Sequence, residues 1–297
     1  MSSLLLPSTK SVQQRALDLL ALAGIRLDRE DSKGDRNVSL KGIRWPSTAA
    51  FAHQSRIPGL VASGQYTLGL VGLDSVRESG ADVKICADLL FNRSTWEKAR
   101  VVLVTGEDGL TDASSVPNGA EVLTEYPFLT RSFFRKLGRK VRVISSRGSI
   151  ESEVPLPYPF GVCLTETGEG LRANRLRVIG TLMETSTVLI ANRQECEYAQ
   201  FQKDVLMFKT ILLGVIAARE KVMLVANVPQ DNLSAVLAVL PALTSPTVAP
   251  LANERYVSVS AVVPRSQLND LQEQLLDCRA EGLIVTPLTS LIQSFCD

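Results

Sequence analysis

The sequence has very few of the residues that enzymes commonly use for acid–base and nucleophilic chemistry. A single histidine, His53, occurs among 297 residues, so sites built on histidine, such as Ser–His–Asp triads, are nearly excluded. The five cysteines include no CxxC pair, which indicates neither a zinc site nor a disulfide framework and favours the reducing cytoplasm. Any catalysis must therefore depend on carboxylates, Lys and Arg, main-chain amides or a metal ion.

Long apolar segments and an excess of charge are also absent. No run of about 18 apolar residues occurs, so no transmembrane helix is expected. Residues 1–7 lack the basic region and long apolar core of a signal peptide. The net charge of +1 predicts no general attraction to nucleic acid or to a membrane. Hydrophobic residues make up 45% of the chain, which is enough for the cores of two or three small domains.

Apolar runs alternate with helix-like segments over the first two thirds of the chain, which predicts an α/β fold. Residues 4–6 precede a helical pattern, whereas the polar residues 26–45 are expected to form a hairpin or a loop. We expect two lobes, 1–94 with 164–195 and 95–163, with a ligand cleft between them, because open α/β sheets bind ligands beyond their strand ends. Further strands are expected at 66–72, 83–90, 100–105, 121–127, 141–144, 178–182 and 186–191.

The last third of the chain has a different order of elements. Residues 201–220 predict one continuous helix, within a connecting segment at 196–220. Residues 221–297 then alternate as strand, helix, two strands, helix and strand, which is the order of a ferredoxin-like domain. Such small domains commonly control oligomeric state in response to a ligand, so a regulatory or oligomerisation role is expected, although the fold alone does not fix it.

Residues 164–174 place a turn rich in Gly and Thr between an apolar run and a helix-compatible segment. Main-chain N–H groups of such a turn converge on one point, which suits a phosphate group. Thr165 and Thr167 add hydroxyl donors, whereas Glu166 and Glu169 repel a dianion unless they turn outward or hold Mg²⁺. The alternative is the start of an ordinary capped helix, and the stretch alone does not decide between the two.

Five short motifs follow one another along the chain and carry a family resemblance. They are Ile57-Pro58-Gly59-Leu60-Val61, Leu68-Gly69-Leu70-Val71-Gly72, Thr124-Glu125-Tyr126-Pro127, Gly148-Ser149-Ile150-Glu151 and Glu166-Thr167-Gly168-Glu169. Together with a βαββαβ tail that contains Ser245-Pro246-Thr247, the set resembles the long form of ATP phosphoribosyltransferase, the enzyme that opens histidine biosynthesis. The similarity covers essentially the whole chain.

The resemblance implies a fold and a reaction. The fold is a two-lobed catalytic part like that of periplasmic binding proteins, followed by a regulatory domain that binds histidine in the family and shifts a dimer to an inhibited hexamer. The implied glycosyltransferase reaction joins N1 of ATP to C1 of phosphoribosyl pyrophosphate with inversion, releases pyrophosphate and requires Mg²⁺. The expected partners are these two substrates, an amino-acid effector and further copies of the chain.

The resemblance also implies roles for particular residues. Glu151 and Lys10 are expected in catalysis, with Lys10 facing pyrophosphate or the ATP phosphates. The expected phosphoribosyl contacts are Glu166, Thr167, Gly168, Glu169, Gly170, Ser149 and Cys163. The expected nucleotide contacts are Leu70, Glu125, Tyr126 and Arg36.

Several positions depart from the family pattern. The usual Lys-Gly-Arg-Leu after the first strand is matched here by Ser8-Thr9-Lys10-Ser11-Val12, which keeps one cation. The Asp that normally precedes the phosphate loop and reads the ribose hydroxyls is Cys163, so a charged acceptor worth about 1.5–3 kcal/mol per hydrogen bond is absent. Thr67 and Arg56 replace two further acidic residues, and Gly170 replaces the closing Thr of the loop.

Three interpretations remain open at the level of sequence. The first is a working phosphoribosyltransferase that acts on ATP or a close purine nucleotide. The second keeps this chemistry but places it in specialised metabolism, such as pathways to coformycin-type purine nucleoside antibiotics. The third is a non-catalytic regulatory subunit or sensor that retains the fold and the tail.

Overall fold

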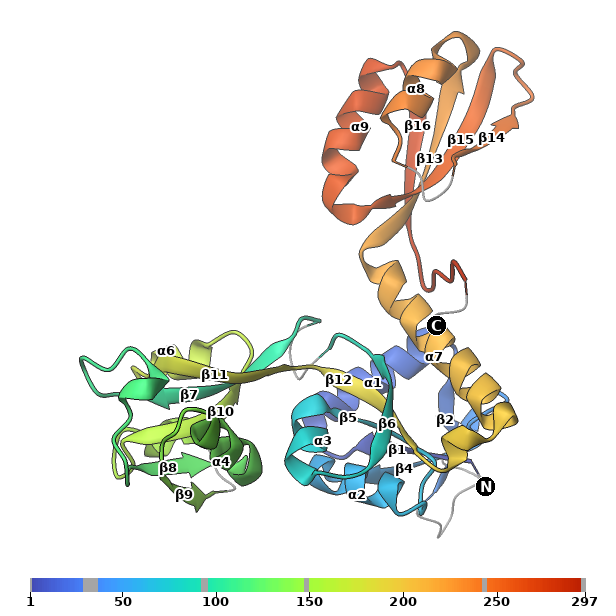
Figure 1. Cartoon of the computed structure of the whole chain (residues 1–297). Coiled ribbons are helices and arrows are strands. Elements are labelled where there is room, and N and C mark those ends of the chain that lie inside the picture. Colours follow the sequence, from blue (N-terminus) through green and yellow to red (C-terminus); the bar gives the residue numbers. More distant parts are fainter. Residues whose placement is uncertain (1, 29–36, 92–95, 147–149, 242–244, 295–297) are drawn as a thin grey trace. The chain divides into compact units, whose positions relative to one another are not determined.

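The computed structural model describes residues 2–28, 37–91, 96–146, 150–241 and 245–294 (Figure 1). The chain forms two compact units, Met1–Lys209 and Thr210–Asp297. Within the described residues, no helix combines the length and the apolar character that crossing a lipid bilayer requires.

The first lobe of the first unit is built on a seven-stranded sheet with the order β2-β3-β4-β1-β5-β12-β6. Its inner strands β1 and β5 are buried along their whole length, because near-continuous apolar runs suit strands that are covered on both faces. The elements are β1 (Ser3–Pro7), α1 (Lys10–Leu22), β2 (Arg26–Asp28), β3 (Val38–Lys41), β4 (Thr48–Ala52), η2 (Gln54–Arg56), α2 (Ile57–Ala62), β5 (Leu68–Gly72), α3 (Leu73–Ser79), β6 (Val83–Asp88) and β12 (Thr187–Asn192).

The sequence pattern predicts this lobe with one omission. β2 and β3 pair antiparallel, which confirms a hairpin within residues 26–45. The sequence pattern does not predict the strand β4, because its residues Thr-Ala-Ala-Phe-Ala have little intrinsic strand preference. Parallel pairing with β1 along all five of its residues makes this segment a strand.

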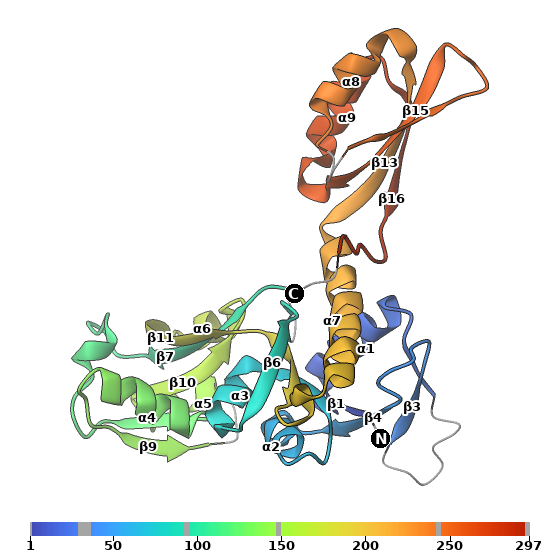
Figure 2. The same ribbon diagram turned by 45° about the vertical axis from the view of Figure 1, so that its right-hand side comes forward.

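The second lobe is a five-stranded sheet with the order β11-β7-β10-β8-β9. Helix α4 packs against β9 and β11 (Figure 2). The elements are β7 (Ala99–Thr105), η3 (Ala113–Ser115), β8 (Glu121–Thr124), α4 (Pro127–Lys136), β9 (Arg142–Ser145), α5 (Ile150–Glu153), β10 (Phe160–Thr165), α6 (Glu169–Ala173) and β11 (Arg177–Thr185).

One predicted boundary between the lobes was wrong. The expectation that 164–195 returns to the first lobe fails for residues up to 185, because β11 pairs antiparallel with β7 in the second sheet. The physical reason is that β7 is an apolar strand buried at six of its seven positions, and it needs a partner on each side. β10 supplies one partner and β11 the other, so only β12 rejoins the first sheet.

The second unit has the predicted βαββαβ order, and its sheet runs β14-β15-β13-β16. Burial alternates strictly along β13 and β15, because one face of the sheet carries the core shared with α8 and α9 (Figures 1 and 2). The unit boundary falls inside the predicted long helix, α7 (Ala199–Arg219). The other elements are η4 (Glu195–Glu197), β13 (Lys221–Pro229), η5 (Gln230–Asn232), α8 (Leu233–Val239), β14 (Thr247–Pro250), β15 (Tyr256–Pro264), η6 (Arg265–Gln267), α9 (Leu268–Asp277) and β16 (Glu281–Pro287).

A close approach at Gly161 positions α5 on the second sheet. A Cβ on Gly161 of β10 would stand 2.5 Å from Ile150 Cγ2 and 2.8 Å from Val154 Cγ2. Only a residue without a side chain lets the short helix lie this close to the strand. The contact brings Glu151 beside the turn that follows β10, where both line one cavity.

Replacing Gly161 with Ala is therefore expected to destabilise the first unit by about 1–3 kcal/mol, the usual cost of overpacking a core. The matched control is Gly59→Ala in α2, where a Cβ meets nothing within 4 Å. That control should be neutral or stabilising by up to about 1 kcal/mol. Urea unfolding followed by tryptophan fluorescence reports on this unit, because Trp45 and Trp96 both lie in it. Equal stability of the two variants would contradict the packing described here.

Candidate active site

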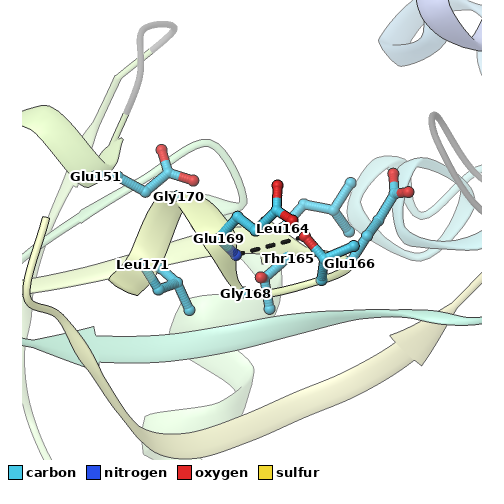
Figure 3. A pocket seen from close by; sticks show the side chains of 9 residues that line it. Glu151, Leu164, Thr165, Glu166, Gly168, Glu169, Gly170 and Leu171 are labelled. Carbon is cyan, nitrogen blue, oxygen red and sulfur yellow. Dashed lines mark hydrogen bonds between the residues drawn. The ribbon is translucent and has the colours of Figure 1, made fainter. Parts of the chain in front are cut away.

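The turn after β10 forms a small cavity of about 200 Å³ (Figure 3). β10 ends at Thr165, and Gly168 caps α6 with a φ of 74°, a left-handed conformation that favours glycine. The lining residues are Glu151, Leu164, Thr165, Glu166, Thr167, Gly168, Glu169, Gly170 and Leu171. The turn is therefore open to a small ligand.

Local hydrogen bonds hold the turn in shape. The Glu169 N–H donates to Thr167 Oγ1 at 3.4 Å, the dashed line in Figure 3. The Arg172 N–H donates to the Gly168 carbonyl oxygen at 3.0 Å. The site thus combines the two alternatives raised by the sequence, since the same turn begins a helix and lines a cavity.

Carboxylates dominate the charge of this cavity. Glu151, Glu166 and Glu169 all line it, and Figure 3 shows Glu151 and Glu166 at opposite ends of the group drawn. The nearest cation to the turn in the described contacts is Arg172, whose Nη1 lies 3.3 Å from the position of a Cβ on Gly168. A phosphorylated ligand would therefore be repelled here unless it brings a cation with it.

A second cavity, of about 660 Å³, lies between the two lobes of the first unit. Its walls come from segments that follow the carboxyl ends of β1, β4, β8 and β9, where α/β sheets bind ligands. The first lobe contributes Thr9, His53, Gln54, Ser55, Arg56, Asp74, Ser75, Glu78 and Ser79, and the second contributes Glu125, Tyr126, Pro127, Ser145 and Ser146.

A buried carboxylate joins the two walls of this interlobe cavity. Asp74 is 7% exposed, and its Oδ2 accepts a hydrogen bond from the Tyr126 hydroxyl at 3.0 Å. Its Oδ1 accepts a second hydrogen bond from Thr185 Oγ1 at 2.7 Å. Tyr126 and Thr185 both belong to the second lobe, so the aspartate of α3 holds the lobes together at the cavity.

A second carboxylate of α3 caps a helix of the other lobe. Glu78 accepts from the main-chain N–H groups of Phe128 and Leu129, at 2.8 and 2.9 Å. These donors lie in the first turn of α4, where N–H groups have no partner within the helix and a negative charge is favourable. Pro127 begins α4 and has no N–H of its own, so Glu78 satisfies the next two.

The structure brings most of the predicted site residues to these two cavities. Glu151 and residues 166–170 line the small cavity, whereas Glu125 and Tyr126 line the interlobe cavity. Lys10 is exposed at the start of α1, next to Thr9 of the interlobe cavity. Leu70 and Cys163 are buried inside β5 and β10 and line neither cavity. Arg36 and Ser149 lie outside the described residues.

Sequence reasoning missed Asp74 and Glu78 as site residues. The pattern of residues 73–78 indicates a helix, and this pattern predicts no site role for either acid. One signal was available for Asp74, because it follows the Gly-terminated buried strand β5 by two residues, at the edge where ligands bind. Glu78 gives no such signal, since its role depends on a helix start that is 50 residues away in sequence.

Cys163 has an altered acidity. Burial, together with the nearby carboxylates of Glu151 and Glu125, raises the pKa of its thiol to about 12. The thiol is therefore protonated near neutral pH, which excludes a role as a nucleophile of ordinary reactivity.

Comparisons with known proteins identify the family of this chain. Residues 53–211 match the model of the family described as ATP phosphoribosyltransferase, and residues 218–290 match that of the HisG C-terminal domain. An ATP phosphoribosyltransferase of Pyrobaculum aerophilum is 34% identical over 291 residues, 97% of this chain and 99% of the relative. That of Pelotomaculum thermopropionicum is 36% identical over 236 residues, 80% of this chain and 82% of the relative.

A solved structure supports the fold. A chain of the ATP phosphoribosyl transferase (HisG:HisZ) complex from Thermotoga maritima matches with a TM-score of 0.60 at 20% identity, covering 73% of this chain and 99% of that one. The family match covers more than half of the sequence, and the two relatives align with 80% and 97% of it. The chain therefore belongs to the ATP phosphoribosyltransferase family and carries the C-terminal domain of that family.

Proposed function

We propose that the chain transfers the phosphoribosyl group of phosphoribosyl pyrophosphate to N1 of ATP and releases pyrophosphate. The observation that carries this proposal is the turn at 165–170, which lines a small cavity with two threonines and two glycines in a member of this family. The turn suits the 5′-phosphate of the donor. The larger interlobe cavity, which borders Tyr126, suits the nucleotide.

The chemistry matches what the described residues offer. The N1 lone pair of adenine attacks C1 of the ribose as the bond from C1 to the pyrophosphate oxygen breaks, and positive charge develops at C1. Such a step gains mainly from alignment and electrostatic stabilisation, so it needs neither a histidine base nor a cysteine nucleophile. The roles of Glu151 and Lys10 near the donor and its leaving group belong to this proposal.

Mg²⁺ is part of the same proposal. No group of three or more His, Cys, Asp or Glu side chains in the described part of the chain is arranged to hold a metal ion. Magnesium in such sites is commonly held by one or two carboxylates together with substrate phosphates. One or two of the lining carboxylates Glu151, Glu166 and Glu169 would meet that requirement, and a bound cation would neutralise the developing charge on pyrophosphate.

The departures from the family pattern leave this function intact in our proposal. Thr67, at the position of a usual Asp, has a structural contact instead, since its hydroxyl accepts from the Ser3 N–H and donates to the Ser3 carbonyl oxygen, both at 2.9 Å. Arg56 lines the interlobe cavity, where a cation in place of an acid favours a triphosphate. The relatives cited above are 34–36% identical and carry the name ATP phosphoribosyltransferase, which favours the first of the three interpretations.

Regulation and assembly extend the proposal. We propose that the protein is cytoplasmic, that an amino-acid effector binds to the second unit, and that the chain assembles into homo-oligomers. These expectations rest on the match of residues 218–290 to the HisG C-terminal domain and on the relatives.

The expected outcome of the direct assay is turnover. Protein mixed with ATP, phosphoribosyl pyrophosphate and Mg²⁺ should release pyrophosphate and produce the absorbance of an N1-substituted adenine, and chelation of the metal should stop both. If the protein binds ATP or histidine but forms no product, the sensor interpretation replaces this one.

Replacing Gly168 with Asp should weaken donor binding on the order of 100-fold, because it puts a side chain and a negative charge into the turn and costs two charge-assisted hydrogen bonds. The matched control is Gly138→Asp, since Gly138 also has a left-handed backbone, with a φ of 68°, and lines neither cavity. Calorimetric titration with phosphoribosyl pyrophosphate and Mg²⁺ measures the effect. Equal affinity in Gly168→Asp and the control would remove the turn from the donor site.

Cys163 should resist alkylation. A pKa raised from 9.0 to about 12 leaves on the order of 100- to 1000-fold less thiolate near pH 8 than in an ordinary cysteine. Mass spectrometry after timed iodoacetamide treatment of the folded protein should find Cys163 unmodified while denatured protein is modified there. Rapid labelling of native Cys163 would show that the thiol is a reactive group of the site.

A further inference from the structure

Tyr126 is held at both ends where it lines the interlobe cavity. Its main-chain N–H donates to Thr124 Oγ1 at 2.8 Å, and its hydroxyl donates to Asp74 Oδ2 at 3.0 Å. Only 7% of the residue is exposed, yet it lines the cavity. Because the hydroxyl proton is committed to Asp74, the aromatic ring is the larger part of Tyr126 that can contact a ligand.

The acceptor, Asp74, is itself held in place by its neighbours. Its Oδ1 accepts from Thr185 Oγ1 at 2.7 Å, and its own N–H donates back to that oxygen at 3.0 Å. A Cβ on Gly72 would stand 2.4 Å from Asp74 Oδ1, so the carboxylate lies against a residue that has no side chain. A buried network whose members all have partners is rigid. The carboxylate is therefore a fixed point from which Tyr126 is aligned.

The two side-chain contacts of Asp74 require its hydrogen-bonding shape and not its negative charge. Both donors, on Tyr126 and Thr185, are neutral hydroxyl groups. An amide in the same place could accept from Tyr126 through its oxygen, while its NH₂ group could donate to Thr185 Oγ1. Asparagine at position 74 would therefore preserve the alignment of Tyr126 and remove only the charge.

We propose that Asp74 is a positioning residue for the nucleotide, because it fixes the ring of Tyr126 through the hydroxyl and contributes no charge to the reaction. This inference rests on the proposed function, in which ATP occupies the interlobe cavity. Aromatic rings contact other rings favourably only in particular orientations. A ring that is fixed before the nucleotide arrives avoids the entropy loss of immobilising it on binding. The donor, which binds in the small cavity, gains nothing from this contact.

The first variant, Tyr126→Phe, keeps the ring and removes its hydrogen bond to Asp74. Steady-state kinetics of the full-length chain, with ATP and phosphoribosyl pyrophosphate varied in turn, measure the effect. We expect the KM for ATP to rise about three- to tenfold, the cost of immobilising one side chain on binding. The kcat and the KM for phosphoribosyl pyrophosphate should stay within about twofold, because only binding of the nucleotide is weakened. Calorimetric titration with ATP alone should show the same loss without turnover.

Variants of Asp74 separate positioning from a role of its charge. Asp74→Ala should raise the KM for ATP as Tyr126→Phe does, and the double variant should be no worse, because both changes break one contact. Asp74→Asn should keep both kcat and the KM for ATP within about twofold. A large loss of kcat in Asp74→Asn, or additive losses in the double variant, would overturn the proposal. Tyr126→Phe and Asp74→Asn preserve the side-chain shapes, so the test does not depend on the folding of Asp74→Ala.

Thr67→Val is the matched control for the loss of a hydroxyl. The Thr67 hydroxyl has two hydrogen bonds to the main chain of Ser3, and the residue lines neither cavity. Its replacement should lower the thermal unfolding midpoint, as Tyr126→Phe does, and leave the KM for ATP unchanged. An equal affinity for ATP in Tyr126→Phe and Thr67→Val would overturn this inference alone. An unaltered chain that binds no ATP in the calorimeter would overturn the proposed function together with it.

Discussion

The carboxylate of Asp74 is the contact on which the arrangement of the catalytic unit depends. It accepts hydrogen bonds from Tyr126 and Thr185, so one side chain of the first lobe contacts two segments of the second. Removing it would break two hydrogen bonds to a carboxylate, each worth about 1.5–3 kcal/mol. Glu78, one turn further along α3, adds a cap for α4. Both walls of the interlobe cavity are therefore held by acids of one short helix.

The two cavities of the first unit differ in the charge that they present to a ligand. Two threonines and two glycines line the small cavity, but its three carboxylates make the approach of a phosphate unfavourable without a cation. The interlobe cavity has mixed charge, since Arg56, Glu78 and Glu125 all line it. In the proposed function, the donor phosphate occupies the small cavity and the nucleotide occupies the interlobe cavity.

Much of this architecture could be predicted from sequence, because its elements follow local patterns. The βαββαβ order of residues 221–297 and the turn at Gly168 both follow from apolar periodicity and glycine placement. The strand β4 could not be predicted, because its alanine-rich sequence forms a strand only by pairing with β1. β11 was assigned to the wrong lobe because a strand's partner is a long-range property that its own residues do not encode. Asp74 and Glu78 were missed for the same reason, since their partners lie in the other lobe.

The central claim is that the main chain at 165–170 binds the donor. Hydrogen–deuterium exchange of the whole chain, with and without phosphoribosyl pyrophosphate and Mg²⁺, tests it most directly. We expect slower exchange in the peptide that covers residues 164–171, because bound phosphate oxygens would accept hydrogen bonds from its amides. Unchanged exchange in that peptide under saturating donor, with protection confined to other segments, would contradict the account.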